Sequence, residues 1–205
     1  MNRSVFGVML ATSFVVSSPA WAIFNVQVLG GNRDAKFSGS GYTSDTLKAS
    51  ELRAAAHVDP IPLVPIAFGL GVSQTTFDDK STKLGIDKID GVDIDLEVEA
   101  WLPLELAGLV PYAKVGYTVA GAYSFEATPI GGVSPKFVYK PSGVTLHVGL
   151  KYEFLLRLGV MAEFETGTRT LKFDKATDVG NLNFSNLKDI DENSTSILIG
   201  VQAGI

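Results

Sequence analysis

The sequence predicts an all-β fold, an eight-stranded antiparallel up-and-down β-barrel. Three observations support this prediction. Apolar and polar residues alternate in eight segments, and the connections between the segments are alternately long and short. After residue 22, no run of about 18 apolar residues could form a membrane-spanning helix. A period of two places apolar side chains on one face of a strand and polar side chains on the other.

Residues 1–22 are interpreted as a secretory signal peptide. Arg3 supplies a positive charge, residues 5–16 are mostly apolar, and Ala20, Trp21 and Ala22 have the small-residue pattern of a cleavage site. We therefore expect an exported protein with one domain over residues 23–205. The sequence has no Cys, which excludes disulfides, a thiolate metal site and a lipoprotein anchor.

The first three predicted strands span residues 23–32, 49–58 and 65–76. In the second of them, Glu51, Arg53 and His57 share one face. The opposite face is aliphatic, so each strand is expected to have one polar and one apolar side.

The fourth strand, 91–103, has the clearest alternation in the chain. Asp93, Asp95, Glu97 and Glu99 lie on one face, and only apolar residues lie between them. A helix would scatter both sets around its axis, so this pattern indicates a strand with one apolar and one acidic face.

The last four strands are predicted at 111–126, 143–154, 157–169 and 195–205. Their polar faces carry Lys114, Glu126, His147, Lys151, Glu153, Arg157, Glu163, Glu165 and Arg169. Their apolar faces carry the aromatic residues Tyr117, Tyr123, Phe125, Tyr152, Phe154 and Phe164.

The predicted connections are alternately long and short. The long ones are 33–48, 77–90, 127–142 and 174–194, and the short ones are 59–64, 103–110 and a reversal near residue 155. Pro and Gly, which form turns, occur in both kinds. A meander with long loops at one end and short turns at the other predicts a closed barrel, because closure removes exposed strand edges.

Two kinds of barrel fit this alternation. A soluble, lipocalin-like barrel would enclose a ligand with its apolar face, whereas a transmembrane barrel would turn that face to lipid. Three features favour the membrane: a polar face rich in Gly and Ala, apolar strand faces of roughly 9 to 11 residues, and aromatic residues near strand ends. The residues expected to form the two aromatic girdles are Phe24, Phe68, Tyr152 and Phe154 at the short turns, and Tyr123 and Phe125 at a long loop.

The chain resembles the small eight-stranded outer-membrane proteins of Gram-negative bacteria, of the OmpA-barrel, OmpX and OmpW type. The resemblance is architectural and covers residues 23–205. Gly200, Ala203 and Ile205 occupy the places of the usual C-terminal assembly signal, although the terminal aromatic residue is missing. The resemblance implies a location in the outer membrane, with membrane lipid, lipopolysaccharide and the barrel-assembly machinery as partners.

In such a barrel the polar face lines the lumen, where we expect a network of charged side chains. Its predicted members are Glu51, Arg53, His57, Asp93, Asp95, Glu97, Glu99, Lys114, His147, Lys151, Glu153, Arg157, Glu163, Glu165 and Arg169. With Glu126, the acids outnumber the bases on this face. An uncompensated buried charge lowers the stability of a protein by roughly several kcal/mol. We therefore expect the lumen to hold trapped water, a bound cation or carboxylates that keep a proton. Any solute passing through would more easily be a cation.

No catalytic residues, metal site or cofactor are predicted. The stretch 87–95 lacks the spacing of an EF-hand loop, and the sequence contains no G-x-S-x-G motif. Some small outer-membrane barrels act on lipid A with a His that is closely followed by Ser. Neither His57 nor His147 is followed by Ser in this way. The net charge of −5 without a basic cluster argues against nucleic-acid binding. Trp101 is expected to plug the short-turn end.

Three functions remain open from the sequence. The first is a narrow, cation-preferring or small-solute passage, as the OmpW type suggests. The second is a structural or surface-interaction barrel that acts through its long loops. The third is the soluble ligand-binding barrel. Eight strands leave an interior just wide enough for side chains, which argues against a wide pore. The oligomeric state is not predicted.

Overall fold

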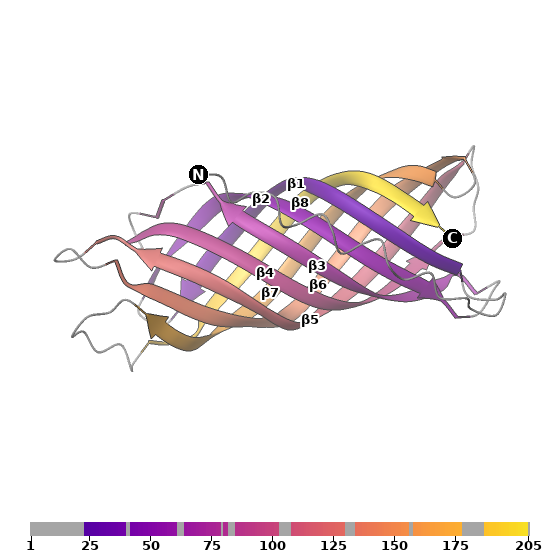
Figure 1. The fold of residues 1–205 in the computed structure, drawn as a ribbon. Helices are drawn as coiled ribbons and strands as arrows, with labels where there is room; N and C mark the ends of the chain where they lie inside the picture. The colour runs from indigo at the N-terminus through magenta and orange to yellow at the C-terminus, as the bar shows by residue number, and fades with distance from the viewer. Residues whose placement is uncertain are drawn as a thin grey trace, which may run out of the picture.

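The computed structural model describes residues 23–39, 42–60, 64–78, 80–81, 85–102, 108–129, 134–155, 158–177 and 187–204. Eight antiparallel strands form a closed barrel, in which β8 pairs with β1 (Figure 1). The strands are β1 (Ile23–Gly39), β2 (Tyr42–Asp59), β3 (Ile66–Phe77), β4 (Ile86–Trp101), β5 (Leu109–Ala127), β6 (Lys136–Leu155), β7 (Leu158–Thr177) and β8 (Ile190–Gly204). The predicted fold class is confirmed. The predicted signal peptide, Arg157 and Ile205 lie outside the described residues.

The strands are longer than the sequence patterns predicted. The long connection expected at 33–48 is wrong, because β1 and β2 continue through it and are paired as far as Gly39 and Tyr42. The other three long connections shrink to 78–85, 128–135 and 178–189. Polar residues such as Asp34 and Lys36 suggested a loop, but they lie on the outer face of a strand whose inner face still holds Phe37.

The outer surface of the barrel is apolar. Large aliphatic side chains such as Leu52, Leu96 and Ile199 are 52–68% exposed. A surface of this kind is unstable in water and suited to lipid. The soluble alternative, with the apolar face inward, is therefore wrong. Among the described residues, no helix is long and apolar enough to cross a membrane.

Aromatic residues lie on the outer surface near the end of the barrel at which β1 begins and β8 ends, the chain-terminal end. Phe24, Phe68, Tyr152 and Phe154 are exposed there, as expected for one interfacial girdle. The prediction that Tyr123 and Phe125 belong to the opposite girdle is wrong, because both side chains are buried inside the barrel.

A bulge in β5 explains this error. Ile94 of β4 pairs with Ala120, but the next residue, Asp95, pairs with Thr118, so Val119 is an extra residue. Val119 and Ala120 both face outward, and the residues after them have the opposite orientation to the one expected. Ala122 and Glu126 consequently lie outside, not in the lumen, and the two aromatic residues lie inside.

Two apolar clusters lie in the interior, one toward each end. The mouth cluster lies where the long connections begin, and consists of Ala35, Phe37, Leu47, Ala49, Phe77, Ile89, Tyr123, Phe125, Tyr139, Leu171 and Ile190. The terminal cluster lies in the half that holds the chain-terminal strand ends, and consists of Leu29, Tyr112, Met161 and Leu198, with Trp101 packed against it. The expected plugging role of Trp101 agrees with this position. Charged side chains fill the space between the clusters.

The bulge depends on Gly121. Its φ is +153° and a Cβ there would overlap the carbonyl oxygen of Val92. We expect Gly121→Ala to lower the free energy of unfolding by roughly 1–3 kcal/mol, measured by urea titration in phospholipid vesicles. Gly30→Ala is the control, because the nearest atom to its Cβ would be 3.8 Å away. Equal stability of the two variants would contradict this account of the bulge.

Candidate functional site

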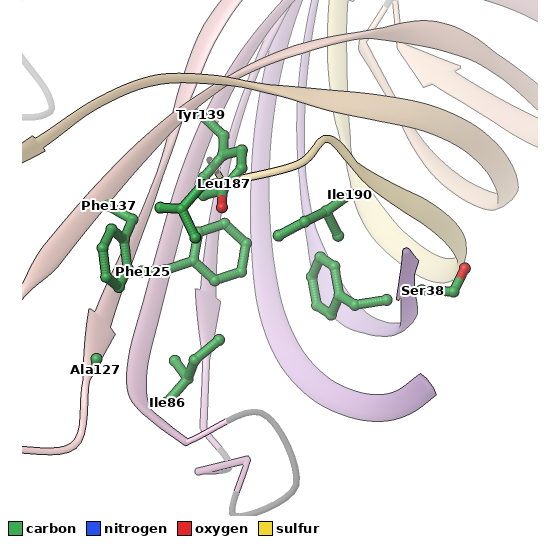
Figure 2. Close-up of a pocket in the computed structure, with 9 residues that line it drawn as sticks. Ser38, Ile86, Phe125, Ala127, Phe137, Tyr139, Leu187 and Ile190 are labelled. Carbon is green, nitrogen blue, oxygen red and sulfur yellow. The ribbon is translucent and has the colours of Figure 1, made fainter. Parts of the chain in front are cut away.

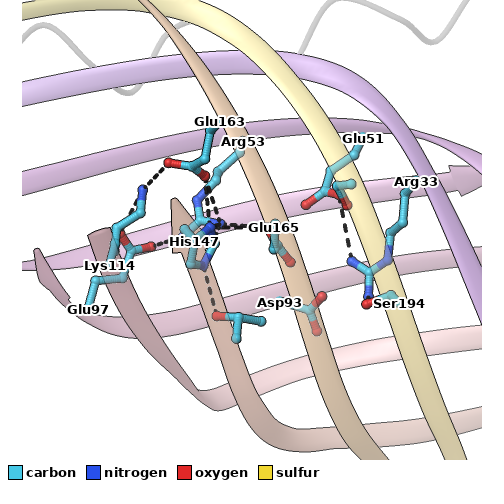
Figure 3. Close-up of polar contacts among 12 residues, drawn as sticks. Arg33, Glu51, Arg53, Asp93, Glu97, Lys114, His147, Glu163, Glu165 and Ser194 are labelled. Atoms are coloured by element: carbon cyan, nitrogen blue, oxygen red, sulfur yellow. Dashed lines mark hydrogen bonds and ion pairs between the residues drawn. The ribbon is translucent and has the colours of Figure 1, made fainter. Parts of the chain in front are cut away.

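The middle of the barrel holds a network of buried charged side chains (Figure 3). Every strand except β3 contributes at least one of them. Among the described residues, the buried acids are Glu51, Asp93, Asp95, Glu97, Glu99, Glu163, Glu165 and Glu192. The buried bases are Arg33, Arg53, Lys114, Lys151 and Arg169, with His57 and His147. Buried groups of this kind are stable only when they are paired or hydrogen-bonded.

Arg53 of β2 lies at the centre of the network. Its guanidinium group forms an ion pair with Glu97 of β4 and donates to Glu165 Oε2 of β7 at 2.9 Å. The inner face of β3 has only Gly71 beside this pair, where a Cβ would overlap the Glu97 carboxylate. The glycine therefore lets one guanidinium group join strands on different sides of the barrel.

Lys114 of β5 makes the second junction. Its Nζ lies 2.9 Å from Glu163 Oε2 and 3.6 Å from Glu97 Oε2. His147 Nδ1 lies 2.8 Å from the other oxygen of Glu163, and the Tyr112 hydroxyl donates to Oε2 at 2.8 Å. His57 Nε2 is 2.9 Å from Glu97 Oε2. Both histidines thus belong to the hydrogen-bonded network.

Arg33 and Glu192 pair nearer the mouth, and neither was predicted. The Arg33 guanidinium also donates to Ser194 Oγ at 3.1 Å. Both residues were assigned to loops. Each would have been found by continuing the alternation of its strand, since Gln27 and Leu29 precede Arg33 on the same face.

Lys151 and Glu99 form an ion pair toward the terminal end. Gln27 Nε2 donates to Glu99 Oε2 at 3.0 Å, and the Lys151 ammonium lies 4.6 Å from the centre of the Tyr112 ring. The ion pair therefore adjoins the terminal cluster.

The predicted lumen set is mostly found where expected. Thirteen of its fifteen members are buried in the barrel. Glu153 is exposed near the strand end, where its Oε1 accepts a hydrogen bond from Gln202 at 2.8 Å. Arg157 is outside the described residues. The expected acidic surplus persists, with eight buried acids and five buried lysines and arginines among the residues that the structure describes.

One group in the network has the spacing of a metal site. Ligand atoms of His147, Glu163 and Glu165 lie within 4.8 Å of one another. However, Arg53 Nη1 lies 2.9 Å from Glu165 Oε2, and Lys114 Nζ lies at the same distance from Glu163 Oε2. These two positive charges already neutralise the carboxylates and would repel a metal ion.

A pocket that no sequence pattern predicted opens in the mouth cluster (Figure 2). Its volume is about 90 Å³. The pocket is lined by Phe37, Ser38, Ile86, Phe125, Ala127, Phe137, Tyr139, Leu187 and Ile190. Phe125 packs edge-on against Phe37 and Tyr139, with ring centres 5.8 and 5.2 Å apart. The site is therefore a largely apolar hollow at one end of the barrel.

Comparison with known families agrees with this architecture. The family model described as outer membrane protein beta-barrel domain matches residues 6–202. The chain belongs to this family. The resemblance to small outer-membrane barrels is thereby confirmed, and the protein is an outer-membrane β-barrel whose apolar band faces lipid.

Several solved outer-membrane barrels share the fold of this family member. Neisserial surface protein A has a TM-score of 0.57 at 15% identity, over 88% of this chain and 96% of that one. AlkL, solved by solid-state NMR in lipid bilayers, has a TM-score of 0.54 at 12% identity, over 93% of this chain and 94% of AlkL. OprG from Pseudomonas aeruginosa has a TM-score of 0.53 at 12% identity, over 90% of this chain and 96% of OprG. No curated protein matches the sequence. At these identities the likeness concerns the fold alone.

The network predicts that losing one cation is costly. We expect Lys114→Met to reduce the free energy of unfolding by about 3 kcal/mol, because Glu163 would lose its lysine partner in the barrel interior. Lys140→Met, which removes an exposed pair with Asp174, should cost less than about 1 kcal/mol. Urea titration of both variants in vesicles measures the difference. A similar small loss for both would contradict a role of the network in stability.

Proposed function

We propose that the protein is an outer-membrane barrel with a closed lumen, which acts by binding the apolar part of a small molecule at its mouth. The mouth pocket carries this proposal. Outer-membrane barrels place their longer connections outside the cell, so the pocket would face the exterior. This is a form of the surface-interaction function considered from the sequence.

The packing of the interior supports a closed lumen. The charged network lies between the mouth and terminal clusters. Among the residues that the structure describes, the six buried glutamates all form ion pairs with lysine or arginine side chains. A permeating ion would have to break these pairs and separate the apolar clusters. A narrow cation passage, predicted from the acidic lumen, is therefore not the function that the geometry favours.

The chemistry of the pocket favours an alkyl ligand. Aromatic and aliphatic side chains supply nearly all of its lining, and apolar cavities hold apolar guests more readily than water. A volume of about 90 Å³ is smaller than the cavity of about 150 Å³ that takes benzene. It therefore suits the end of an alkyl chain, with the remainder of the molecule outside. Each buried methylene contributes about 0.8 kcal/mol.

The proposed role is binding and not catalysis. That the protein is not an enzyme stays a prediction, as do lipopolysaccharide and the assembly machinery as partners.

Filling the pocket should abolish binding. Ala127 is half-buried and lines the pocket, so Ala127→Leu would occupy part of its volume. We expect octanol to shift the methyl NMR signals of Ile86 and Ile190 in lipid nanodiscs containing the wild type, and to lose at least tenfold in affinity in the variant. Ala113→Leu, on the lipid-facing surface, is the control and should bind normally. Unchanged octanol binding by Ala127→Leu would refute the pocket as the site.

A closed lumen predicts that the protein does not conduct ions. The refolded protein, shown to be inserted in a planar bilayer, should give no discrete conductance steps, because ion pairs and the two apolar clusters fill the lumen. Cation-preferring steps that shrink in Glu97→Gln would support the passage instead. Those two results separate the two functions.

A further inference from the structure

We propose that the barrel interior binds one hard cation, with Ca²⁺ as the best fit, between Asp93 and Asp95 of β4 and Ser73 of β3. This site is separate from the mouth pocket and does not depend on the proposed function. Four observations support it: the charge of the interior, the position of the unpaired acid, the unpartnered oxygens around it and the small residues beside it.

The interior carries too few cations for its acids. Among the described residues, eight buried acids face five buried lysines and arginines. With neutral histidines the ionised network would hold three excess negative charges. One divalent ion removes two of them, which a monovalent ion cannot do.

The excess is concentrated on β4. Each buried glutamate lies within 4 Å of a lysine or arginine nitrogen. Asp93 Oδ2 lies 3.7 Å from Arg169 Nη2 and accepts a hydrogen bond from the Tyr123 hydroxyl at 3.0 Å. Asp95 forms no ion pair within the described structure. The guanidinium nitrogens of Arg53 bind Glu97 and Glu165 instead.

Several buried oxygens in this region have no hydrogen-bond partner among the described residues. They are both carboxylate oxygens of Asp95, Oδ1 of Asp93 and the hydroxyl of Ser73. All three residues are at most 1% exposed. Ser73 lies directly opposite Asp93 in the β3–β4 pairing, and side chains opposite each other across a ladder have Cβ atoms about 5 Å apart. Alternate residues of one strand share a face, so Asp95 lies on the same inner surface.

Small residues lie opposite the two aspartates on the adjacent strands. Asp95 lies between Gly71 and Thr118 on the adjacent strands, and Asp93 lies opposite Gly121 on β5. None of these residues has a large side chain that could cover the carboxylates.

The donors indicate the class of ion. Carboxylate and hydroxyl oxygens are ligands of hard cations, and Ca²⁺ accepts irregular oxygen sets completed by water. The group of His147, Glu163 and Glu165 is a poorer candidate, since Arg53 and Lys114 neutralise it.

Equilibrium dialysis with ⁴⁵Ca²⁺ tests the proposal directly. The full barrel would be refolded with Ca²⁺ in detergent free of lipopolysaccharide, and dialysed in 100 mM KCl, a condition chosen to displace weak surface binding. We expect one Ca²⁺ per barrel in the wild type and none in Asp95→Asn, and at least tenfold weaker binding in Ser73→Ala. Asp90→Asn is the control, because Asp90 lies on the same strand but pairs with Lys88 at the surface.

Thermal unfolding supplies a second measurement. At saturating Ca²⁺ the melting temperature of the wild type and of Asp90→Asn should rise by about 5 °C relative to EDTA. The Asp95→Asn barrel should melt at the same temperature in both conditions. The amide replaces the carboxylate without a change of shape, so heat-modifiable gel migration should show that the variant folds.

Two results would overturn the proposal. If the wild type binds no Ca²⁺ and its melting temperature does not respond, Asp95 is compensated by water or a proton. If Asp95→Asn binds as much Ca²⁺ as the wild type, the ion lies elsewhere on the chain. Neither result would affect octanol binding at the mouth, which tests the proposed function separately.

Discussion

The structure depends on the compensation of charges buried inside a barrel whose outer surface is apolar. Lipid can stabilise the outside but offers nothing to the polar face, which the alternation of each strand necessarily turns inward. Arg53 and Lys114 meet this constraint, because each joins acids from other strands. The network therefore stabilises the middle of the barrel between the two apolar clusters, and it also limits how much of the lumen is available to a solute.

The interior is layered along the barrel axis. Aromatic and aliphatic residues gather near the mouth, charged pairs fill the middle, and the terminal cluster with Trp101 lies toward the other end. Such layering separates an apolar pocket at the mouth from an ionic region in the middle of the barrel. Function at the mouth can then vary without disturbing the ion pairs that stabilise the barrel.

The sequence alone predicted the eight strands, the lipid-facing surface and thirteen members of the charge network, because alternation is a local signal that closure of the barrel preserves. It failed where the local signal changes. Val119 and Ala120 both face outward, and no residue pattern predicts this break in the alternation. The sequence-based assignment therefore gave the side chains of Tyr123, Phe125 and Glu126 the wrong face of the strand. Beyond the apolar band the outer face of the strands becomes polar, so the alternation ends there. For this reason Arg33 and Glu192 were assigned to loops. The mouth pocket depends on side chains from several strands and follows from no single segment.

A double-mutant cycle between Arg53 and Glu97 tests the central claim most directly. The free energies of unfolding of the wild type, Arg53→Met, Glu97→Gln and the double variant would be measured in phospholipid vesicles. The account predicts a coupling energy of about 2 kcal/mol or more, with the double variant more stable than Arg53→Met, since the second change removes a carboxylate that has lost its arginine partner. A coupling energy below about 0.5 kcal/mol, within the error of additivity, would mean that charge compensation does not hold this barrel together.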